Sequence, residues 1–109
     1  MARLASGLWV SAYLARLQGQ GIFAHVAHRG EKTAGAVAVK LATMDGRASV
    51  FVRTLDGEGE RVWSALFEHG PEPEADAAIA RQRKFDRDLW VVEVEDPRGR
   101  HLLDEDGLG

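Results

Sequence analysis

Two stretches of the chain repeat apolar residues at the spacing of an amphipathic α-helix. The first runs from Ser6, a candidate N-cap, to about Gln18, and the second runs from about Glu74 to Phe85. The apolar positions are Val10, Tyr13, Leu14 and Leu17 in the first stretch and Ala75, Ala78, Ile79 and Phe85 in the second. Residues three and four apart lie on the same side of a helix. Each stretch therefore predicts a helix with one buried face.

Five further stretches alternate apolar and polar residues, the pattern of half-buried strands. They are residues 22–29, 36–43, 48–55, 61–68 and 89–95. The Asp-Gly pair between the second and third of these stretches is a typical hairpin turn. The stretch 61–68 also fits a short helix. Consecutive strands joined by short turns predict an antiparallel meander of three to four strands.

One face of the stretch 36–43 is made almost entirely of small side chains. That face carries Ala36, Ala38, Lys40 and Ala42, whereas the other carries Val37, Val39 and Leu41. Small residues let a helix approach a sheet closely. We therefore interpret this face as a helix contact rather than as an opening for a ligand.

The order of these elements predicts an α+β protein in which helices and sheet form layers. The expected order is a helix, the meander, a second helix and a final strand with a short C-terminal hairpin. That hairpin combines a type I turn at Asp96–Gly99 with a returning strand at His101–Leu103. We expect residues 1–109 to form a single compact domain, with residues 104–109 as a frayed acidic tail.

Charge is distributed unevenly along the 109 residues, whose net charge is −3. Residues 1–55 contain seven Lys or Arg and two acidic residues, whereas residues 56–109 contain seven basic and fifteen acidic residues. The two halves either attract each other across the fold or present faces to partners of opposite sign. An acidic chain without a concentrated basic stripe argues against nucleic-acid binding.

The composition also bears on location. The chain has no cysteine, which excludes disulfides and thiolate metal sites and agrees with a reducing cytoplasm. The apolar stretch Leu4–Ala15 is too short to span a membrane, and helical periodicity explains it better than a signal peptide does. We therefore expect a soluble cytoplasmic protein with no membrane segment. No motif specifies a cofactor, and none is expected.

Asp45 is the first of three candidates for a catalytic residue. The element order matches the core of restriction-endonuclease-like nucleases, in which carboxylates hold Mg²⁺ beside an activated water. Asp45 lies at the hairpin where such an acid would stand. The next strand, however, offers Val50–Arg53, with neither a carboxylate nor a lysine. The sequence therefore supplies only one of the two ligands that this chemistry needs.

Glu93 and Glu95 are the other two candidates, since they share one face of the last strand. Two carboxylates at this spacing are suited to binding a divalent cation or to acid–base catalysis. The competing interpretation is a solvated strand end with salt bridges to Arg98, Arg100 or Arg81, and we favour it.

His25 and His28 invite a metal interpretation that the strand pattern disfavours. Side chains three residues apart on a strand point to opposite sides of the sheet. We therefore predict no metal site.

A polar patch around the second helix supplies the candidate binding residues, namely Arg81, Gln82, Arg83 and Asp88. Arg81 and Arg83 complement the dipole of the helix end, and Asp88 suits a turn before the last strand. Gln82 is polar within an otherwise apolar stripe, and we expect it to hydrogen-bond a strand edge near Trp90.

Several short motifs spread over the whole chain resemble one known family. They are Met1-Ala-Arg-Leu, Trp9-Val-Ser-Ala-Tyr-Leu, Thr33-Ala-Gly-Ala-Val, Arg61-Val-Trp-Ser, Ala80-Arg-Gln-Arg and the run Phe85-Asp-x-Asp-Leu-Trp-Val-Val-Glu-Val-Glu-Asp-x-x-Gly-Arg-His-Leu-Leu. The chain looks like a member of domain of unknown function 1491, a family of small uncharacterised bacterial proteins. The resemblance implies a compact single-domain α/β protein and brings no activity, cofactor or catalytic residue.

Two functional hypotheses follow. The first is a non-catalytic interaction or regulatory protein that uses the polar patch and the strand end at Glu93 and Glu95, with an unknown protein partner or a second copy of the chain. The second is a metal-dependent enzyme, nuclease-like or another hydrolase, that uses the strand carboxylates.

Overall fold

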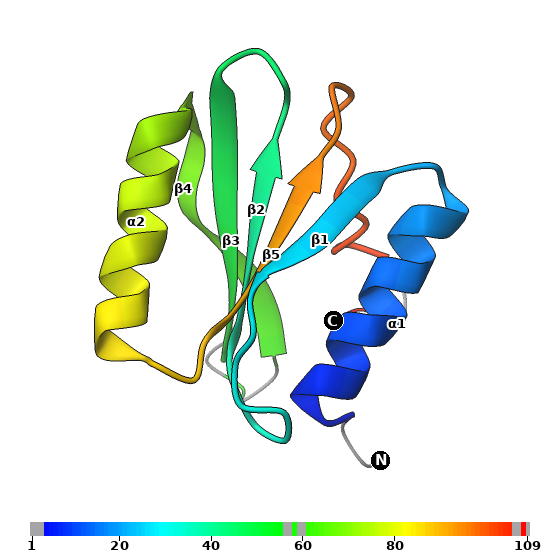
Figure 1. Cartoon of the computed structure of the whole chain (residues 1–109), viewed down its shortest axis with the longest axis vertical. Helices are drawn as coiled ribbons and strands as arrows, with labels where there is room; N and C mark the ends of the chain where they lie inside the picture. Colours follow the sequence, from blue (N-terminus) through cyan, green and yellow to red (C-terminus); the bar gives the residue numbers. More distant parts are fainter. Residues whose placement is uncertain (1–3, 56–57, 59–60, 106–107, 109) are drawn as a thin grey trace.

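A mixed five-stranded sheet with one helix packed on each face organises the computed structural model (Figure 1). The structure describes residues 4–55, 58, 61–105 and 108. The elements in chain order are α1 (Ser6–Gly19), β1 (Phe23–His28), β2 (Val37–Ala42), β3 (Arg47–Leu55), β4 (Arg61–Pro71), α2 (Glu72–Phe85) and β5 (Trp90–Glu95). The strand order is β1-β5-β2-β3-β4.

The predicted α+β class and order of elements are confirmed. β2, β3 and β4 form the antiparallel meander. β1 is separated from that meander because β5 lies between β1 and β2, antiparallel to β1 and parallel to β2. Residues 61–68 belong to strand β4, so the alternative interpretation of this stretch as a helix is wrong.

The returning strand predicted at His101–Leu103 is not formed. The turn before it is present, since the Gly99 amide donates to the Asp96 carbonyl at 3.0 Å. Leu102, however, has a φ of 59°, which is incompatible with an extended strand. The backbone groups instead bond to side chains: the His101 carbonyl accepts from the Tyr13 hydroxyl at 2.8 Å, and the Leu103 amide donates to His101 Nδ1 at 2.9 Å.

α1 covers one face of the sheet and forms the larger apolar cluster. Trp9, Tyr13 and Leu17 are buried with Val92 and Val94 of β5. The indole of Trp9 stacks on the ring of Tyr13 with centroids 4.9 Å apart. Burial raises the pKa of Tyr13, so its hydroxyl stays protonated as a donor.

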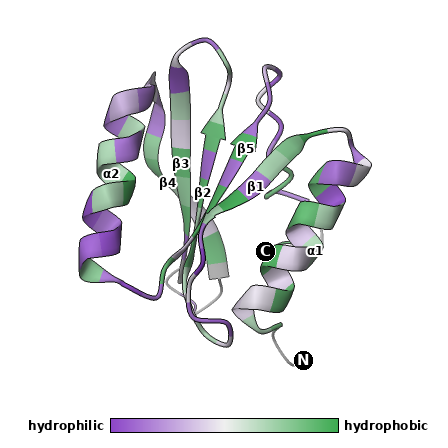
Figure 2. Ribbon diagram, viewed as in Figure 1, coloured by the Kyte–Doolittle hydropathy of each residue, from purple (hydrophilic) through white to green (hydrophobic). Residues whose placement is uncertain are grey.

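α2 covers the other face, where small side chains line the contact as predicted. Ala38 and Ala42 of β2 are buried against a cluster that includes Ala75 and Ile79 of α2. Figure 2 shows α2 as a mainly hydrophilic helix with few apolar residues, whereas α1 carries more of them. The small strand residues allow this narrow apolar stripe to reach the sheet.

The segment predicted as a frayed tail, residues 104–109, lies partly outside the described residues. Of the described part, Leu108 is buried, and its carbonyl accepts from Trp63 Nε1 at 3.0 Å. Glu105 forms an ion pair with Arg16 of α1 at 3.5 Å. The burial of Leu108 and these two contacts hold the described part of the segment against the body of the protein.

Candidate functional site

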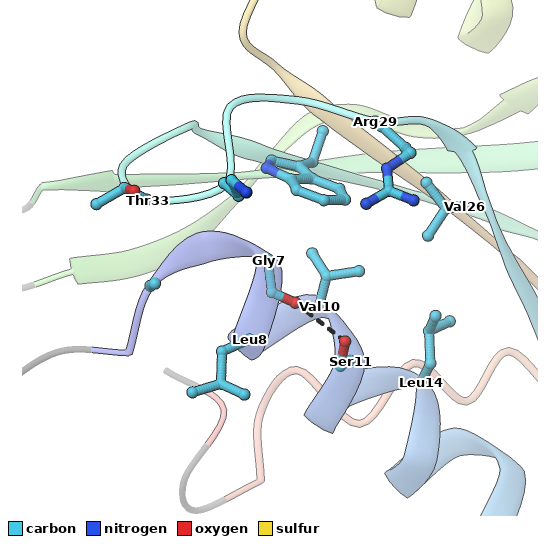
Figure 3. A pocket seen from close by; sticks show the side chains of 11 residues that line it. Gly7, Leu8, Val10, Ser11, Leu14, Val26, Arg29 and Thr33 are labelled. Carbon is cyan, nitrogen blue, oxygen red and sulfur yellow. Dashed lines mark hydrogen bonds between the residues drawn. The ribbon is translucent and has the colours of Figure 1, made fainter.

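A groove with a volume of about 730 Å³ lies between α1 and the residues that end β1 and lead to β2 (Figure 3). We call it the α1 groove. One wall belongs to α1 and consists of Gly7, Leu8, Val10, Ser11 and Leu14. The opposite wall consists of Val26, Arg29, Lys32 and Thr33, and Ala5 and Trp90 complete the lining. Its volume falls within the range of ligand sites, about 300–1,000 Å³.

The loop between β1 and β2 fixes the position of α1 beside the groove. The first helix amides donate to loop carbonyls: Ser6 N to Thr33 O at 3.1 Å, and Gly7 N to Lys32 O at 2.9 Å. The prediction of Ser6 as N-cap is wrong, because its hydroxyl donates instead to the Gly35 carbonyl at 2.6 Å. Loop carbonyls therefore replace the usual side-chain cap.

Trp90 anchors the same loop from the sheet side. Its indole Nε1 donates to the Glu31 carbonyl at 2.8 Å, and its amide donates to the Ala36 carbonyl at 2.8 Å. The guanidinium of Arg29 lies 5.9 Å from the centre of the Trp90 ring. Hydrogen bonds at both ends of the loop give the groove a preformed wall, which lowers the entropic cost of binding.

The lining of the α1 groove combines apolar surface with positive charge. Arg29 and Lys32 are its two charged side chains. Glu31 stands between them in sequence, but its carboxylate accepts hydrogen bonds from the amides of Thr33 and Ala34 at 3.0 and 2.6 Å. These bonds, chiefly that from Ala34, lower the pKa of the Glu31 carboxyl. They also direct the carboxylate toward the backbone of its own loop.

Two leucines near the start of α1 are largely exposed, one in the groove wall and one just before the helix. Leu8 is 59% exposed and Leu4 is 49% exposed. Figure 3 shows Leu8, Val10 and Leu14 along one side of the groove, and the Arg29 side chain extending from the opposite side. Large exposed leucines beside a hollow are typical of interaction surfaces. Sequence reasoning missed this site, although a leucine outside the predicted helix stripe was a usable signal.

Asp45 lies in the hairpin between β2 and β3. Its Oδ1 accepts a hydrogen bond from Thr43 Oγ1 at 2.6 Å and another from the Arg47 amide at 3.2 Å. These contacts, led by that with Thr43, lower the pKa of the Asp45 carboxyl. The observed role is that of a turn residue.

Glu93 and Glu95 lie on the α2 side of β5, and Glu93 belongs to a charged network. Its Oε1 lies 3.8 Å from His25 Nε2, and Lys40 is its register partner on β2. Arg100, a predicted partner of these glutamates, instead bonds to Asp96 at 2.8 Å. Among residues 4–55, 58, 61–105 and 108, no three His, Asp or Glu groups are placed to hold a metal ion.

Lys40 is the centre of that network, and sequence reasoning did not single it out. The side chain is only 5% exposed, and its Nζ lies 2.7 Å from Glu72 Oε2 and 2.6 Å from Asp76 Oδ1. Burial would lower the pKa of the ammonium, but hydrogen bonds to Asp76 and Glu72 outweigh it and raise the pKa. A lysine among alanines on an inward strand face was the available signal.

The two histidines do not follow the predicted opposite orientation. A β-bulge lies between Val26 and His28, so His25 pairs with Glu93 and His28 pairs with Val91. The extra residue shifts the alternation by one, and both side chains lie on the α2 side. His28 Nδ1 lies 3.2 Å from Arg83 Nη2, whereas His25 faces Glu93. The two rings therefore have different partners.

The predicted polar patch is dispersed over several roles. Arg81 is exposed, Arg83 contacts His28, and the Gln82 carbonyl accepts the hydrogen bond that ends α2. The Asp88 carbonyl accepts from the Glu31 amide at 3.0 Å, at the base of the loop beside the α1 groove. Gln82 does not lie beside Trp90, since Trp90 is in the cluster on the α1 face and α2 covers the opposite face.

Over the described part of the chain, neither helix has the length and apolar character needed to cross a membrane.

These observations define a small α+β protein with one helix on each sheet face and a groove beside the first helix. The chain belongs to the family described as Protein of unknown function (DUF1491), whose profile matches residues 4–104. The family resemblance seen in the sequence motifs is thereby confirmed. Among proteins with curated descriptions, none matches the chain.

Solved structures support the family and the fold. The chain is 41% identical to a DUF1491 family protein from Caulobacter crescentus CB15 in a crystal structure, with a TM-score of 0.86, covering 94% of this chain and 97% of that one. An NMR structure of a DUF1491 family protein from the same organism gives 40% identity, a TM-score of 0.85 and 96% coverage of each chain. The protein Atu0922 from A. tumefaciens is 33% identical, with a TM-score of 0.76 and 86% coverage of each chain.

Proposed function

We propose that the protein is a non-catalytic interaction module that binds another protein at the α1 groove. The observation that supports this function is the groove itself, a preformed hollow with the exposed side chain of Leu8 in its wall and the exposed Leu4 a few residues before it. Burial of such apolar surface against a partner stabilises the complex by roughly 25 cal/mol per Å². A partner side chain that enters the groove gains this stabilisation without a rearrangement of the loop.

We place this interaction in the cytoplasm, and the absence of cysteine from the 109 residues supports a reducing compartment. The partner we propose is a protein other than a second copy of this chain.

Site-specific photo-crosslinking in the native cells tests the proposed function. A benzophenone amino acid introduced at Leu8 is expected to give a discrete adduct with one partner. The matched control carries the same amino acid at Phe85, another exposed apolar residue, at the end of α2. Absence of adducts from Leu8, or the same adducts from both positions, contradicts the proposal. An adduct of twice the mass of the chain assigns the groove to a homodimer instead.

A further inference from the structure

We infer that the α1 groove takes an acidic amphipathic peptide segment, with aliphatic side chains along one side and carboxylates along the other. This inference rests on the proposed function and names the chemistry of the partner. Its basis is the difference between the two walls of the groove.

The α1 wall is apolar and the loop wall is basic. Leu8, Val10 and Leu14 provide aliphatic contacts on the α1 side, and Arg29 and Lys32 stand on the opposite side. Along the described part of α1, the one charged side chain is Arg16, which pairs with Glu105 and does not line the groove. A segment seated between these walls needs apolar groups toward α1 and negative groups toward the loop.

Arg29 and Lys32 are available for such negative groups. Within the described ranges, neither has a carboxylate within ion-pair distance, whereas Arg16 and Arg100 each have one and Lys40 has two. The carboxylate of Glu31 is held by the Thr33 and Ala34 amides. Charges beside apolar walls act in a lower effective dielectric than charges in open water, so a carboxylate there binds more strongly.

The shape of the groove favours a peptide over other anionic partners. A planar membrane surface does not fill a hollow of this volume. A fatty acid brings one carboxylate, whereas Arg29 and Lys32 are three positions apart and offer two cationic sites. Leu8 in the wall is largely exposed, and the exposed Leu4 is not part of the lining, which suits a ligand that extends beyond the hollow.

A second copy of the chain is a poor source of the acidic segment. The acidic stretch at residues 104–109 of its own sequence includes Leu108, which is buried and whose carbonyl accepts a hydrogen bond from Trp63. Releasing that segment costs these contacts before any new ones form. We therefore assign the segment to a different protein.

Selection from a display library of random dodecapeptides on the immobilised protein tests the inference. The enriched peptides are expected to carry Asp or Glu interspersed with Leu, Ile, Val or Phe. Their affinity is expected to fall by roughly tenfold or more in a Leu8→Glu variant and in an Arg29→Glu/Lys32→Glu variant, since a tenfold loss corresponds to about 1.4 kcal/mol. It is also expected to fall as salt is added, because salt screens exposed charges.

Two controls make the outcome specific. A Phe85→Glu variant places a new charge on a distant exposed residue and is expected to keep wild-type affinity. Peptides in which Lys replaces the acidic residues are expected to bind the Arg29→Glu/Lys32→Glu variant better than the wild type, which a misfolded variant would not do. The melting temperature of each variant identifies loss of folding.

The outcomes separate the inference from the proposed function. Peptides that bind at the groove but are neutral or basic overturn the acidic class and leave the groove as the binding site. Peptides whose binding is abolished by Phe85→Glu and retained by Leu8→Glu show that the groove is not the binding site. Failure to enrich any peptide also overturns the inference. If the protein binds oleate or phosphatidylglycerol vesicles but no peptide, the groove is a lipid site instead.

Discussion

Replacing Gly30 with alanine is expected to lower the free energy of unfolding by about 3 kcal/mol, a large effect for one methyl group. A Cβ at this position would lie 2.7 Å from the Trp90 amide nitrogen and closer still to the Asp88 carbonyl oxygen. These two contacts are with backbone atoms, which cannot move aside as a flexible side chain can, and the Trp90 ring atom Cδ1 lies only 2.6 Å from the same position. The Glu31–Asp88 backbone hydrogen bond at the base of the loop is expected to break.

Gly19 provides the matched control for this substitution. A Cβ there meets no atom within 4 Å, and Gly19→Ala is expected to be neutral or slightly stabilising. Thermal unfolding measures the stability of both variants, and each kcal/mol shifts the melting temperature by roughly 4–8 °C in a domain of this size. Equal melting temperatures for Gly30→Ala and the wild type would show that the loop does not depend on this close approach.

Removing both carboxylates that hold Lys40 is expected to cost more stability than removing the lysine. The double variant Glu72→Ala/Asp76→Ala leaves a buried ammonium without its hydrogen-bond partners, at a cost of about 3 kcal/mol. In the reverse case, Lys40→Met leaves two carboxylates whose side chains are 41% and 55% exposed and are readily hydrated. That loss is expected to be about 1 kcal/mol.

Urea unfolding of the variants measures this asymmetry. Glu74→Ala controls for the loss of a negative charge in the first turn of α2, which by itself is worth about 0.3–1 kcal/mol. Adding Lys40→Met to the double variant is expected to restore part of its stability, because the unpaired charge is then gone. Simple additivity of the three substitutions would contradict a buried, charged lysine.

Local patterns predicted most of the elements because periodicity is a local property of the chain. The helices, the hairpin at Asp45 and the contact between the alanine face of β2 and α2 all follow from nearby residues. The position of β5 between β1 and β2 depends on pairing between distant segments. Its signal is the consecutive apolar run Trp90, Val91 and Val92, whose side chains are buried on both faces of the sheet because a helix covers each face.

Two irregularities were beyond prediction from periodicity. The bulge after Val26 shifts His28 to the side of the sheet that also carries His25, and alternation alone assigns them to opposite sides. The left-handed backbone of Leu102 ends the extended chain after β5. Both depend on tertiary contacts, which for Leu102 include the bond between Tyr13 and the His101 carbonyl.

The candidate site was the least predictable part of the molecule. The segment around Lys32 reads locally as a turn-rich connection, and Leu8 reads as an ordinary exposed helix residue. Only the fold brings them together, since loop carbonyls cap α1 and Trp90 holds the loop from β5. The predicted carboxylate candidates have other contacts, with Asp45 in its hairpin and Glu93 beside His25.

Amide chemical-shift mapping with the tightest selected peptide shows whether the α1 groove is the binding surface. We expect the largest shift changes on titration in Gly7–Ser11 of α1 and in Arg29–Thr33 of the opposite wall, with α2 unchanged. Largest changes along α2 or β4, with the groove residues unaffected, would contradict it.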